Sequence, residues 1–165
     1  MKKIILTLSV VITVLSATCQ HQYDMISRFD QSVKSWKLIE LNGFYGIIDT
    51  SGKVIISPQY DRIFKFGDYK KEWALTELNG FYGFIDTSGK AVVQPQYDRI
   101  FKFGSYKKGW AMIELNGFYG FIDTLGKAVV EPQYDRIFTF GEYQNEWAKV
   151  ELNNKETLIS SCSTG

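Results

Sequence analysis

The sequence predicts an all-β protein in which tandem 37-residue β-hairpin repeats form a single open, solenoid-like array. Two observations support this fold class. Tryptophan recurs at a constant interval of 37 residues, and an Asn-Gly pair, an aspartate and a proline keep the same offsets within each full interval. A fixed period is the signature of a repeat architecture, and Asn-Gly between apolar runs is a strong β-hairpin signal. The tryptophans are Trp36, Trp73, Trp110 and Trp147.

Repeats account for nearly the whole chain after its first twenty residues. Three full units cover residues 36–72, 73–109 and 110–146, and a partial fourth unit begins at Trp147. The stretch before Trp36 has the same pattern as the stretch before Trp73, so a partial unit precedes the first full one. We therefore assign residues 23–165 to one β-repeat domain, with no room for a second domain.

The first two strands of a unit surround its Asn-Gly pair. In the unit that starts at Trp73, we expect strands at residues 73–78 and 81–86, joined by Asn79-Gly80. A two-residue Asn-Gly loop adopts the positive φ angles of a type I′ turn. Side chains alternate along each strand, so Trp73, Leu75 and Glu77 share one face.

Turn residues delimit the rest of the unit. Asp86 and Gly89 occupy the first and fourth positions of a predicted type I turn, in which the carboxylate accepts backbone N–H bonds. Residues 90–94 form a third strand that we expect Pro95 to end, because proline cannot donate to a ladder. In the preceding unit, we expect residues 60–66 to form the fourth strand and residues 67–72 a polar, exposed loop.

The last unit has the pattern of an end unit. Asn153-Asn154 replaces Asn-Gly, and "KETLIS" at residues 155–160 replaces "FYGFID". A terminal repeat that faces water instead of a neighbour is expected to depart from the consensus in this way. Asparagine tolerates the left-handed region, so a hairpin remains compatible with this sequence.

The N-terminus indicates export. Residues 1–18 combine two lysines, an apolar run and small residues near the end, which is the pattern of a signal peptide. The apolar run is too short for a membrane span of about 20 residues. Cys19 follows directly, and this arrangement resembles a bacterial lipoprotein, so we assign residues 19–22 to a lipid-anchor cysteine and a short linker. The alternative is secretion after cleavage near Ala17, because residues 16–18 depart from the usual lipidation motif.

These two alternatives lead to different locations and different cysteine chemistry. Lipidation predicts an outer-membrane or cell-surface lipoprotein, anchored in the membrane through Cys19, with Cys162 as a free thiol. Simple secretion predicts a soluble periplasmic or secreted protein, in which Cys19 can pair with Cys162 in an oxidising compartment. We expect Cys162 to be a terminal thiol without a function.

The charge balance argues against nucleic-acid binding. Residues 1–18 carry two of the 19 basic side chains and no acid, so the remaining chain has 17 basic against 18 acidic side chains. A surface that follows phosphates needs clustered basic charge. Acidic and basic residues instead alternate here, as in Asp61-Arg62 and Asp98-Arg99.

The residue types offer little for catalysis, metal binding or a cofactor. His21 is the single histidine, which argues against a Ser-His-Asp triad and a histidine-rich zinc site. Paired carboxylates for glycoside hydrolysis remain open, among Glu77, Glu114, Asp98 and Asp135. These acids recur in equivalent environments, whereas an acid and base pair needs environments that move two pKa values apart. We therefore predict no catalytic residue, no metal ligand and no cofactor.

Recurring aromatic residues are the candidate ligand-binding groups. Three tyrosines and two tryptophans can present flat amphipathic faces to a sugar, a peptide or a quaternary ammonium group. The alternative is that they pack between units, which we favour for Tyr82 and Trp73 because large aromatics are mostly buried. The candidates are Tyr45, Tyr82, Tyr119, Trp73 and Trp110.

The repeat resembles the WG-repeat family (WG containing repeat, also called KWG). The match rests on Gly80, Gly83-Phe84-Ile85-Asp86, Gly89-Lys90, Pro95, Tyr97-Asp98 and Phe103, and on their equivalents one unit away. The tryptophan that defines the family motif is replaced by Tyr45, Tyr82 and Tyr119. The resemblance implies a bacterial, β-rich repeat protein, often exported, and supplies no catalytic residue.

These observations leave two architectures and three functions to distinguish. A small closed β-propeller is the alternative to the open array, because the chain begins with the second half of a unit and ends with the first half. The leading function is a non-enzymatic binding module at the bacterial cell envelope, with a glycan or protein partner. The alternatives are a structural spacer of an envelope assembly and an envelope glycan hydrolase.

Overall fold

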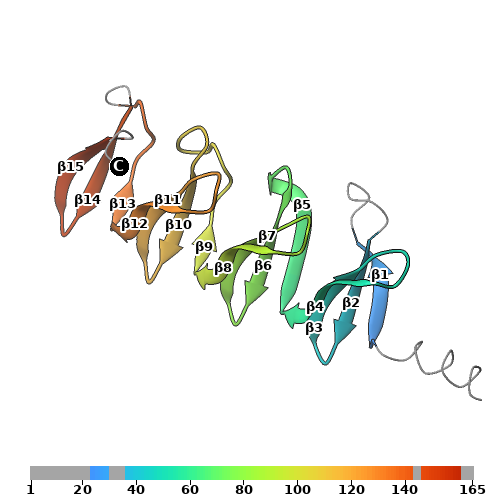
Figure 1. The fold of residues 1–165 in the computed structure, drawn as a ribbon. Coiled ribbons are helices and arrows are strands. Elements are labelled where there is room, and N and C mark those ends of the chain that lie inside the picture. Colours follow the sequence, from blue (N-terminus) through green and yellow to red (C-terminus); the bar gives the residue numbers. More distant parts are fainter. Residues whose placement is uncertain (1–22, 30–35, 143–145, 161–165) are drawn as a thin grey trace, which may run out of the picture. The chain divides into compact units, whose positions relative to one another are not determined.

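The structure, a computed structural model, describes residues 23–29, 36–142 and 146–160 (Figure 1). All regular secondary structure in these ranges is β-strand, which confirms the predicted fold class. The chain divides into two compact units, residues 1–59 and 60–165. Among the described residues, no helix has the length and apolarity needed to cross a membrane. The predicted signal peptide, Cys19, His21 and Cys162 lie outside these ranges.

Four antiparallel sheets follow one another along the chain, and we name them A to D. Sheet A contains β1 (Met25–Arg28), β2 (Lys37–Leu41), β3 (Phe44–Ile48) and β4 (Val54–Tyr60). Sheet B contains β5 (Arg62–Lys70), β6 (Trp73–Leu78), β7 (Phe81–Asp86) and β8 (Ala91–Tyr97). Sheet C contains β9 (Arg99–Ile100), β10 (Ala111–Leu115), β11 (Phe118–Ile122) and β12 (Ala128–Tyr134). Sheet D contains β13 (Arg136–Ile137), β14 (Trp147–Leu152) and β15 (Lys155–Ser160).

Each sheet begins before the tryptophan that we used to mark a unit in the sequence. The second half of one sequence unit supplies the first strand, and the next unit supplies the remaining strands. The two partial units at the chain ends are completed in the same way, because β1 pairs with β2 and β13 pairs with β14. Among the described strands, the first and the last therefore complete separate sheets and do not share the joint fourth blade of the closed-propeller alternative.

The predicted hairpin turns are confirmed. Asn79 and Gly80 have φ angles of 53° and 80°, both positive as a type I′ turn requires. Leu78 pairs with Phe81 across the turn. The end hairpin keeps this geometry without glycine, since Asn153 and Asn154 have φ angles of 53° and 60°.

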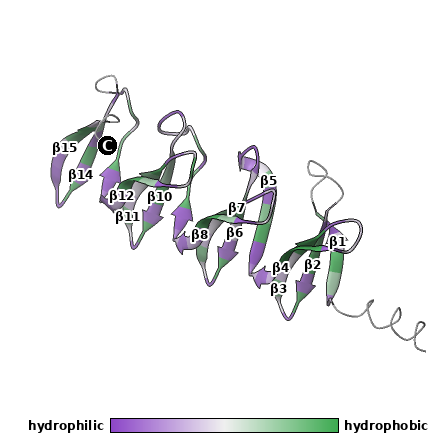
Figure 2. Ribbon diagram, viewed as in Figure 1, coloured by the Kyte–Doolittle hydropathy of each residue, from purple (hydrophilic) through white to green (hydrophobic). Residues whose placement is uncertain are grey.

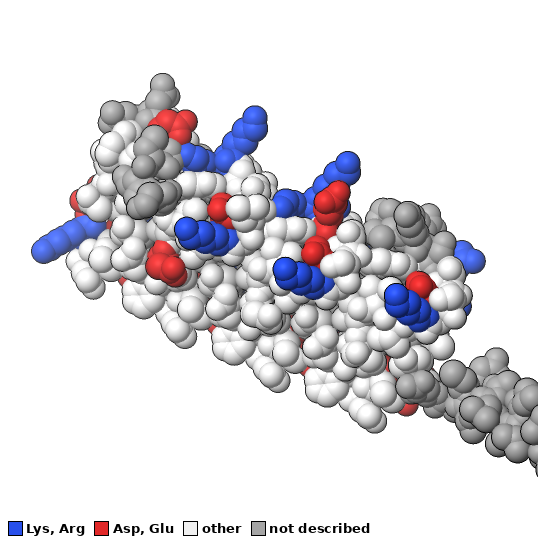
Figure 3. Space-filling model, viewed as in Figure 1, with Lys and Arg blue, Asp and Glu red and all other residues white. Residues whose placement is uncertain are grey.

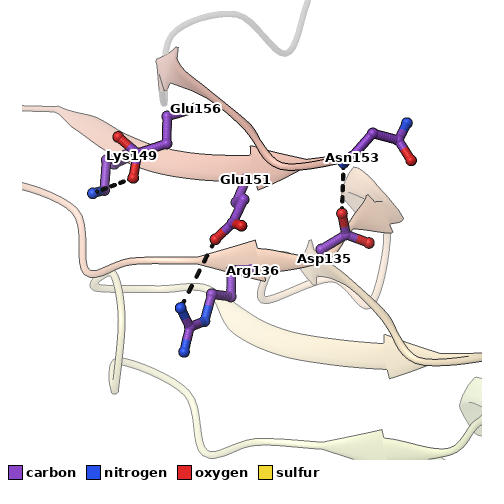
Figure 4. A network of polar contacts seen from close by, with 6 residues as sticks. All are labelled: Asp135, Arg136, Lys149, Glu151, Asn153 and Glu156. Atoms are coloured by element: carbon purple, nitrogen blue, oxygen red, sulfur yellow. Dashed lines mark hydrogen bonds and ion pairs between the residues drawn. The ribbon is translucent and has the colours of Figure 1, made fainter.

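An aspartate from the preceding strand junction stabilises each hairpin turn. Asp61 Oδ2 accepts a hydrogen bond of 2.5 Å from the backbone N–H of Asn79. This bond recurs in every sheet, as Asp24 with Asn42 (2.7 Å), Asp98 with Asn116 (2.5 Å) and Asp135 with Asn153 (2.6 Å). Figure 4 shows the contact between Asp135 and Asn153. A carboxylate acceptor strengthens such a bond, which gives the Asp of the Tyr-Asp pair a structural role.

The predicted Asp-to-Gly turns also form. Asp86 accepts the N–H of Gly89 with its backbone oxygen (3.0 Å), and its Oδ1 accepts the Ser88 hydroxyl (2.6 Å) and the Lys90 N–H (3.1 Å). Partial desolvation raises the pKa of the Asp86 carboxyl, but the bonds from Ser88 and Lys90 outweigh it and bring this pKa below the ordinary value. In the equivalent turn of sheet C, Leu125 replaces Ser88 and supplies only its backbone N–H.

The expectation that Pro95 ends the third strand is wrong. Strand β8 continues through Pro95 to Tyr97, because the pairing of β7 with β8 shifts register between Tyr82 and Phe84. Proline is tolerated at such a bulge, where no ladder bond needs its missing N–H. The bulge lies against Gly83, where a Cβ would stand 2.6 Å from the nitrogen of Pro95. Glycine is therefore required where β8 crosses β7.

The predicted exposed loop at residues 67–72 is partly wrong. Strand β5 continues to Lys70, and Tyr69 turns inward onto Phe84, with 5.7 Å between ring centroids. In sheets C and D the corresponding strand has only two residues. Asp68 and Lys71 are exposed, as we expected for positions where the copies differ.

The core of the second unit lies between successive sheets. Trp73 through Thr76 are all buried, so strand β6 is covered on both faces. Figure 2 shows hydrophobic (green) and hydrophilic (purple) residues mixed along the strands of the sheets. One apolar cluster joins Phe84 and Val93 of sheet B to Ile113 of sheet C, and a second joins sheets C and D. Phe84 and Ile85 are fully buried and Val93 is 3% exposed, as predicted, whereas Val92 is only half-buried. Within the second unit, sheets B and C thus each complete their core with the next sheet.

Candidate functional site

Two small grooves with equivalent linings lie in the second unit, one between sheets B and C and one between sheets C and D. Their volumes are about 280 and 330 Å³. Six lining positions of the first groove recur 37 residues later in the second. The first is lined by Arg62, Phe64, Tyr69, Leu75, Tyr82, Arg99 and Ile100. The second is lined by Phe101, Tyr106, Met112, Tyr119, Asp135, Arg136 and Ile137.

A row of four side chains crosses sheet B beside the first groove. In register across the strands, Arg62 pairs with Glu77, Glu77 with Tyr82, and Tyr82 with Tyr97. Cross-strand pairs lie on the same face of a sheet, so these side chains are neighbours. Sheet C repeats the row as Arg99, Glu114, Tyr119 and Tyr134.

The arginine and the glutamate of each row form a loose ion pair. Arg62 Nη1 lies 3.7 Å from Glu77 Oε2, and Arg99 Nη1 lies 3.9 Å from Glu114 Oε2, both beyond hydrogen-bonding distance. The Arg62 and Arg99 side chains are 67% and 65% exposed, so most of their N–H donors face solvent. Each guanidinium also lies over the phenylalanine two residues later, at 6.0 Å for Phe64 and 5.7 Å for Phe101.

The glutamates of the two rows line neither groove, but each has one buried side-chain oxygen. Glu77 Oε2 and Glu114 Oε2 are buried, and neither has a hydrogen-bond donor among the described residues. A buried polar atom of this kind costs free energy of about 1–3 kcal/mol. The same two oxygens face Arg62 and Arg99 at 3.7 and 3.9 Å, so the ion pairs offset part of this cost.

The candidate tyrosines occupy comparable places in their sheets. Tyr82 and Tyr119 are half-buried, and each lines one groove. Tyr45 is also half-buried and pairs with Glu40 in sheet A, but Met25 occupies the position of the arginine. The full row of Arg, Glu and two Tyr is thus described in sheets B and C.

The candidate tryptophans contribute to packing and do not line either groove. Trp73 is 6% exposed and contacts Phe84 and Phe103, with centroid distances of 5.4 and 5.7 Å. Trp110 is half-buried in the equivalent cluster. Lys70 Nζ lies 3.6 Å from the Trp73 ring centroid, and desolvation lowers the pKa of this lysine. The structure thus assigns Trp73 the packing role that we favoured, and the ligand-binding role of the two tryptophans stays a prediction.

The four carboxylates considered for hydrolysis have other partners. Asp98 and Asp135 accept the hairpin N–H bonds, while Glu77 and Glu114 pair with arginines. No group of three potential metal-binding side chains occurs among the described residues. On the face shown in Figure 3, basic side chains lie beside acidic ones with uncharged surface between them.

Sequence reasoning identified the groove tyrosines but missed their partners. Arg62 and Arg99 were treated only as part of a balanced charge pattern, and Tyr69 was placed in an exposed loop. Their recurrence at intervals of 37 residues, together with the phenylalanine two residues after each arginine, was the available signal.

Comparison with known proteins supports the repeat assignment. The family model described as "WG containing repeat" matches residues 45–80, 82–117 and 119–155, which is more than half of the chain. No curated protein matches the sequence significantly. Among solved structures, a plant lectin with two metal-binding sites from Cicer arietinum aligns over 86% of this chain and 89% of its own, with 16% identity and a TM-score of 0.27. That score is too low to support any argument. On the three tandem family matches and the repeated sheets, the chain belongs to the WG-repeat family.

Proposed function

We propose that this protein is a non-enzymatic binding module exported to the bacterial cell envelope, where its repeated grooves hold a glycan or protein partner. The observation that carries the proposal is the pair of equivalent grooves, each with a half-buried tyrosine and an exposed arginine, which is Arg99 in the first groove and Arg136 in the second. Concave sites with aromatic walls and a few polar groups are the usual form of a ligand site.

Two copies of one site favour a ligand that is itself repetitive. When two modest sites bind the same chain, the second contact forms at a high effective concentration, and the total affinity exceeds that of either site. A polymer of the envelope suits this arrangement. The structure also supports a binding function over hydrolysis, because the candidate carboxylates serve hairpins and ion pairs.

The proposal is tested with the purified full chain and with peptidoglycan and envelope polysaccharide fractions of the producing organism. We expect saturable co-sedimentation with one fraction, and we expect Tyr82→Ala together with Tyr119→Ala to weaken it at least about tenfold, because aromatic faces supply much of the contact energy. A wild-type chain that sediments with no fraction, and recovers no protein partner from detergent-solubilised envelopes, would favour the spacer alternative.

The sequence offers a matched control for the tyrosine variants. Phe81 and Phe118 directly precede Tyr82 and Tyr119, are each 39% exposed, and line neither groove. Neighbouring residues of a strand point to opposite faces. Phe81→Ala with Phe118→Ala therefore removes two aromatic rings from the same hairpins, and we expect it to leave binding unchanged.

The proposed location rests on the N-terminal sequence. We infer that Cys19 carries a lipid anchor that holds the protein on the outer membrane or cell surface, with soluble secretion as the alternative. Full chain produced in bacteria that are fed labelled palmitate should incorporate the label, and Cys19→Ala should not. An unlabelled wild-type chain in the soluble periplasmic or culture fraction would establish the alternative.

A further inference from the structure

The lining of the first groove narrows the class of ligand, on the assumption that the proposed binding function is right. Arg62 and Arg99 both line this groove, and no acidic residue among the described ones does so. The lining of the second groove contains one arginine, Arg136, together with the carboxylate of Asp135. The two grooves therefore have similar apolar walls but differ in charge.

The two guanidinium groups of the first groove have N–H donors available for a ligand. Arg62 Nη1 lies 3.7 Å from Glu77 Oε2, and Arg99 Nη1 lies 3.9 Å from Glu114 Oε2, so both ion pairs are longer than hydrogen bonds. Neither guanidinium donates a hydrogen bond to any other described residue. Because a guanidinium carries several donors in a planar fork, most of them can bind a group in the groove.

The positions of the two glutamates determine which charge a ligand meets. Their Oε2 atoms are buried and line no groove, whereas the side chains of Arg62 and Arg99 are mostly exposed. A ligand in the first groove therefore contacts guanidinium N–H groups and not carboxylate oxygens. The two ion pairs are neutral as a whole, so we expect the attraction to act at short range, through directed hydrogen bonds.

These donors favour a ligand that joins a carboxylate to a ring. The arginine fork matches the planar geometry of a carboxylate, and it would repel an ammonium group. The other five lining residues are apolar or aromatic, and the volume of about 280 Å³ suits one ring. A uronic acid has a carboxylate on a rigid ring whose C–H face can lie on a tyrosine. The acidic side chain of a peptide offers no such face.

We propose that the first groove binds a uronic acid ring of an acidic polysaccharide, with the carboxylate held by Arg62 and Arg99 and the ring lying against Tyr82. Arg62 already lies over Phe64, at 6.0 Å from the ring centroid, and both residues line the groove. One of the two donors is thus partly positioned before the ligand arrives. The second groove, with Arg136 beside Asp135, contacts the same polymer with less preference for an acidic ring.

The test measures binding of the purified full chain to polymers immobilised on a sensor surface, in about 0.15 M salt, which screens long-range attraction. The acidic probes are polygalacturonate, alginate and hyaluronate, which contain different uronic acids. Fully methyl-esterified polygalacturonate has the same rings without the charge, and poly-glutamate has the charge without the rings. We expect saturable binding of at least one acidic polysaccharide, and at least about tenfold weaker binding of both controls.

Two variants test the arginines directly. Arg62→Gln with Arg99→Gln removes both forks, so we expect at least about tenfold weaker binding of the acidic polysaccharide. Arg62→Lys with Arg99→Lys keeps a positive charge opposite each glutamate but removes the forks, and should cause an intermediate loss. Thermal unfolding shows whether each variant keeps its fold. If the glutamine variant does not fold, the lysine variant decides: binding as tight as that of wild type would overturn the role of the forks.

The repeats supply a matched control for the lost charge. Lys65 and Lys102 are exposed, occupy equivalent positions three residues after Arg62 and Arg99, and line neither groove. Lys65→Gln with Lys102→Gln removes two positive charges from the same segments, and we expect binding to change by less than about twofold. A loss equal to that of the arginine variant would show that overall charge, and not the groove, binds the polymer.

The outcomes distinguish this inference from the function on which it rests. Equally tight binding of the esterified polymer would exclude the carboxylate, and equally tight, arginine-dependent binding of poly-glutamate would assign the groove to acidic peptides. Binding of an envelope fraction that depends on Tyr82, without binding of any acidic polysaccharide, would also overturn the inference. Each of these results leaves the proposed binding function intact. If no polymer, envelope fraction or protein partner binds the wild-type chain, both proposals are wrong.

Discussion

Sheets B and D have the same plan but end differently. Both begin with an arginine strand, continue through a tryptophan strand and turn in a tight hairpin. Sheet B then adds β8, whereas β15 is the last strand of sheet D among the described residues. Three consecutive positions differ between the second hairpin strands of the two sheets. Tyr82, Gly83 and Phe84 of β7 correspond to Glu156, Thr157 and Leu158 of β15.

Each of the three residues in β15 lacks a contact that its counterpart in β7 makes. Gly83 allows the bulge of β8 to approach, whereas Thr157 carries a Cβ at that place. Phe84 is fully buried among aromatic rings, while Leu158 is 43% exposed. Glu156 accepts a hydrogen bond of 2.8 Å from Lys149 where Tyr82 lines a groove (Figure 4). The same hairpin can therefore present core and groove side chains or exposed ones, depending on a few positions.

The largest expected effect concerns the aromatic cluster. Phe84→Ala should lower the free energy of unfolding by about 3–5 kcal/mol, because it opens a cavity among Trp73, Tyr69 and Phe103. Leu158→Ala in sheet D should change it by less than about 1 kcal/mol, as surface substitutions usually do. Urea unfolding monitored by tryptophan fluorescence measures both. Equal losses would mean that Leu158 is as important for packing as Phe84.

The next effect concerns the glycine at the strand crossing. Gly83→Thr gives β7 the residue found in β15, and the added Cβ would lie 2.6 Å from the nitrogen of Pro95. We expect a loss of about 3 kcal/mol, the upper end for overpacking, and early amide exchange in β8. Thr157→Gly is the reciprocal control and should cost only about 0.5–1 kcal/mol. Slow exchange throughout β8 in the Gly83→Thr variant would contradict this account.

A smaller effect concerns the hydrogen bond from the hairpin asparagine to an aspartate, which sheets C and D have in common. Asp98→Ala removes the acceptor of the Asn116 N–H bond and should cost about 1–2 kcal/mol, in the range for bonds to charged groups. Because Asp135 makes the same bond to Asn153 at 2.6 Å, Asp135→Ala should cost a similar amount. Thermal unfolding of the two variants decides the point: a clearly smaller loss for Asp135 would show that the end hairpin depends less on this bond.

The smallest effect concerns the turn at Asp86 and depends on pH. Ser88→Leu gives sheet B the residue that sheet C has at Leu125, and removes the hydroxyl bond to Asp86, at a cost of about 0.5–1 kcal/mol near neutral pH. The folded pKa of Asp86 is depressed, so its contribution is present above the ordinary value of 3.8 and is lost as pH falls through the folded pKa. Stability curves of wild type and variant should converge in acid. A difference that persists at pH 2 would exclude the carboxylate as its source.

The local turns were predictable because their chemistry is local. Asn79-Gly80 needs only its own backbone preference to form a type I′ turn, and Asp86 bonds N–H groups within four residues. The candidate tyrosines were also identifiable from their period. The groove was not predictable, because Tyr82 belongs to sheet B whereas two other lining residues, Arg99 and Ile100, belong to sheet C. Periodicity shows that residues are equivalent, but it does not show which of them meet.

By itself, the sequence determined the repeat length, the hairpins, the family and the aromatic positions, since each follows from local backbone preference or from a constant interval. Tertiary structure decided which residues begin a sheet, how Pro95 fits within β8, and that Trp73 is buried while Tyr82 lines a groove. These features depend on contacts between strands and between successive sheets. Such contacts join residues far apart in the chain, and a one-dimensional pattern of residue types does not specify their distances.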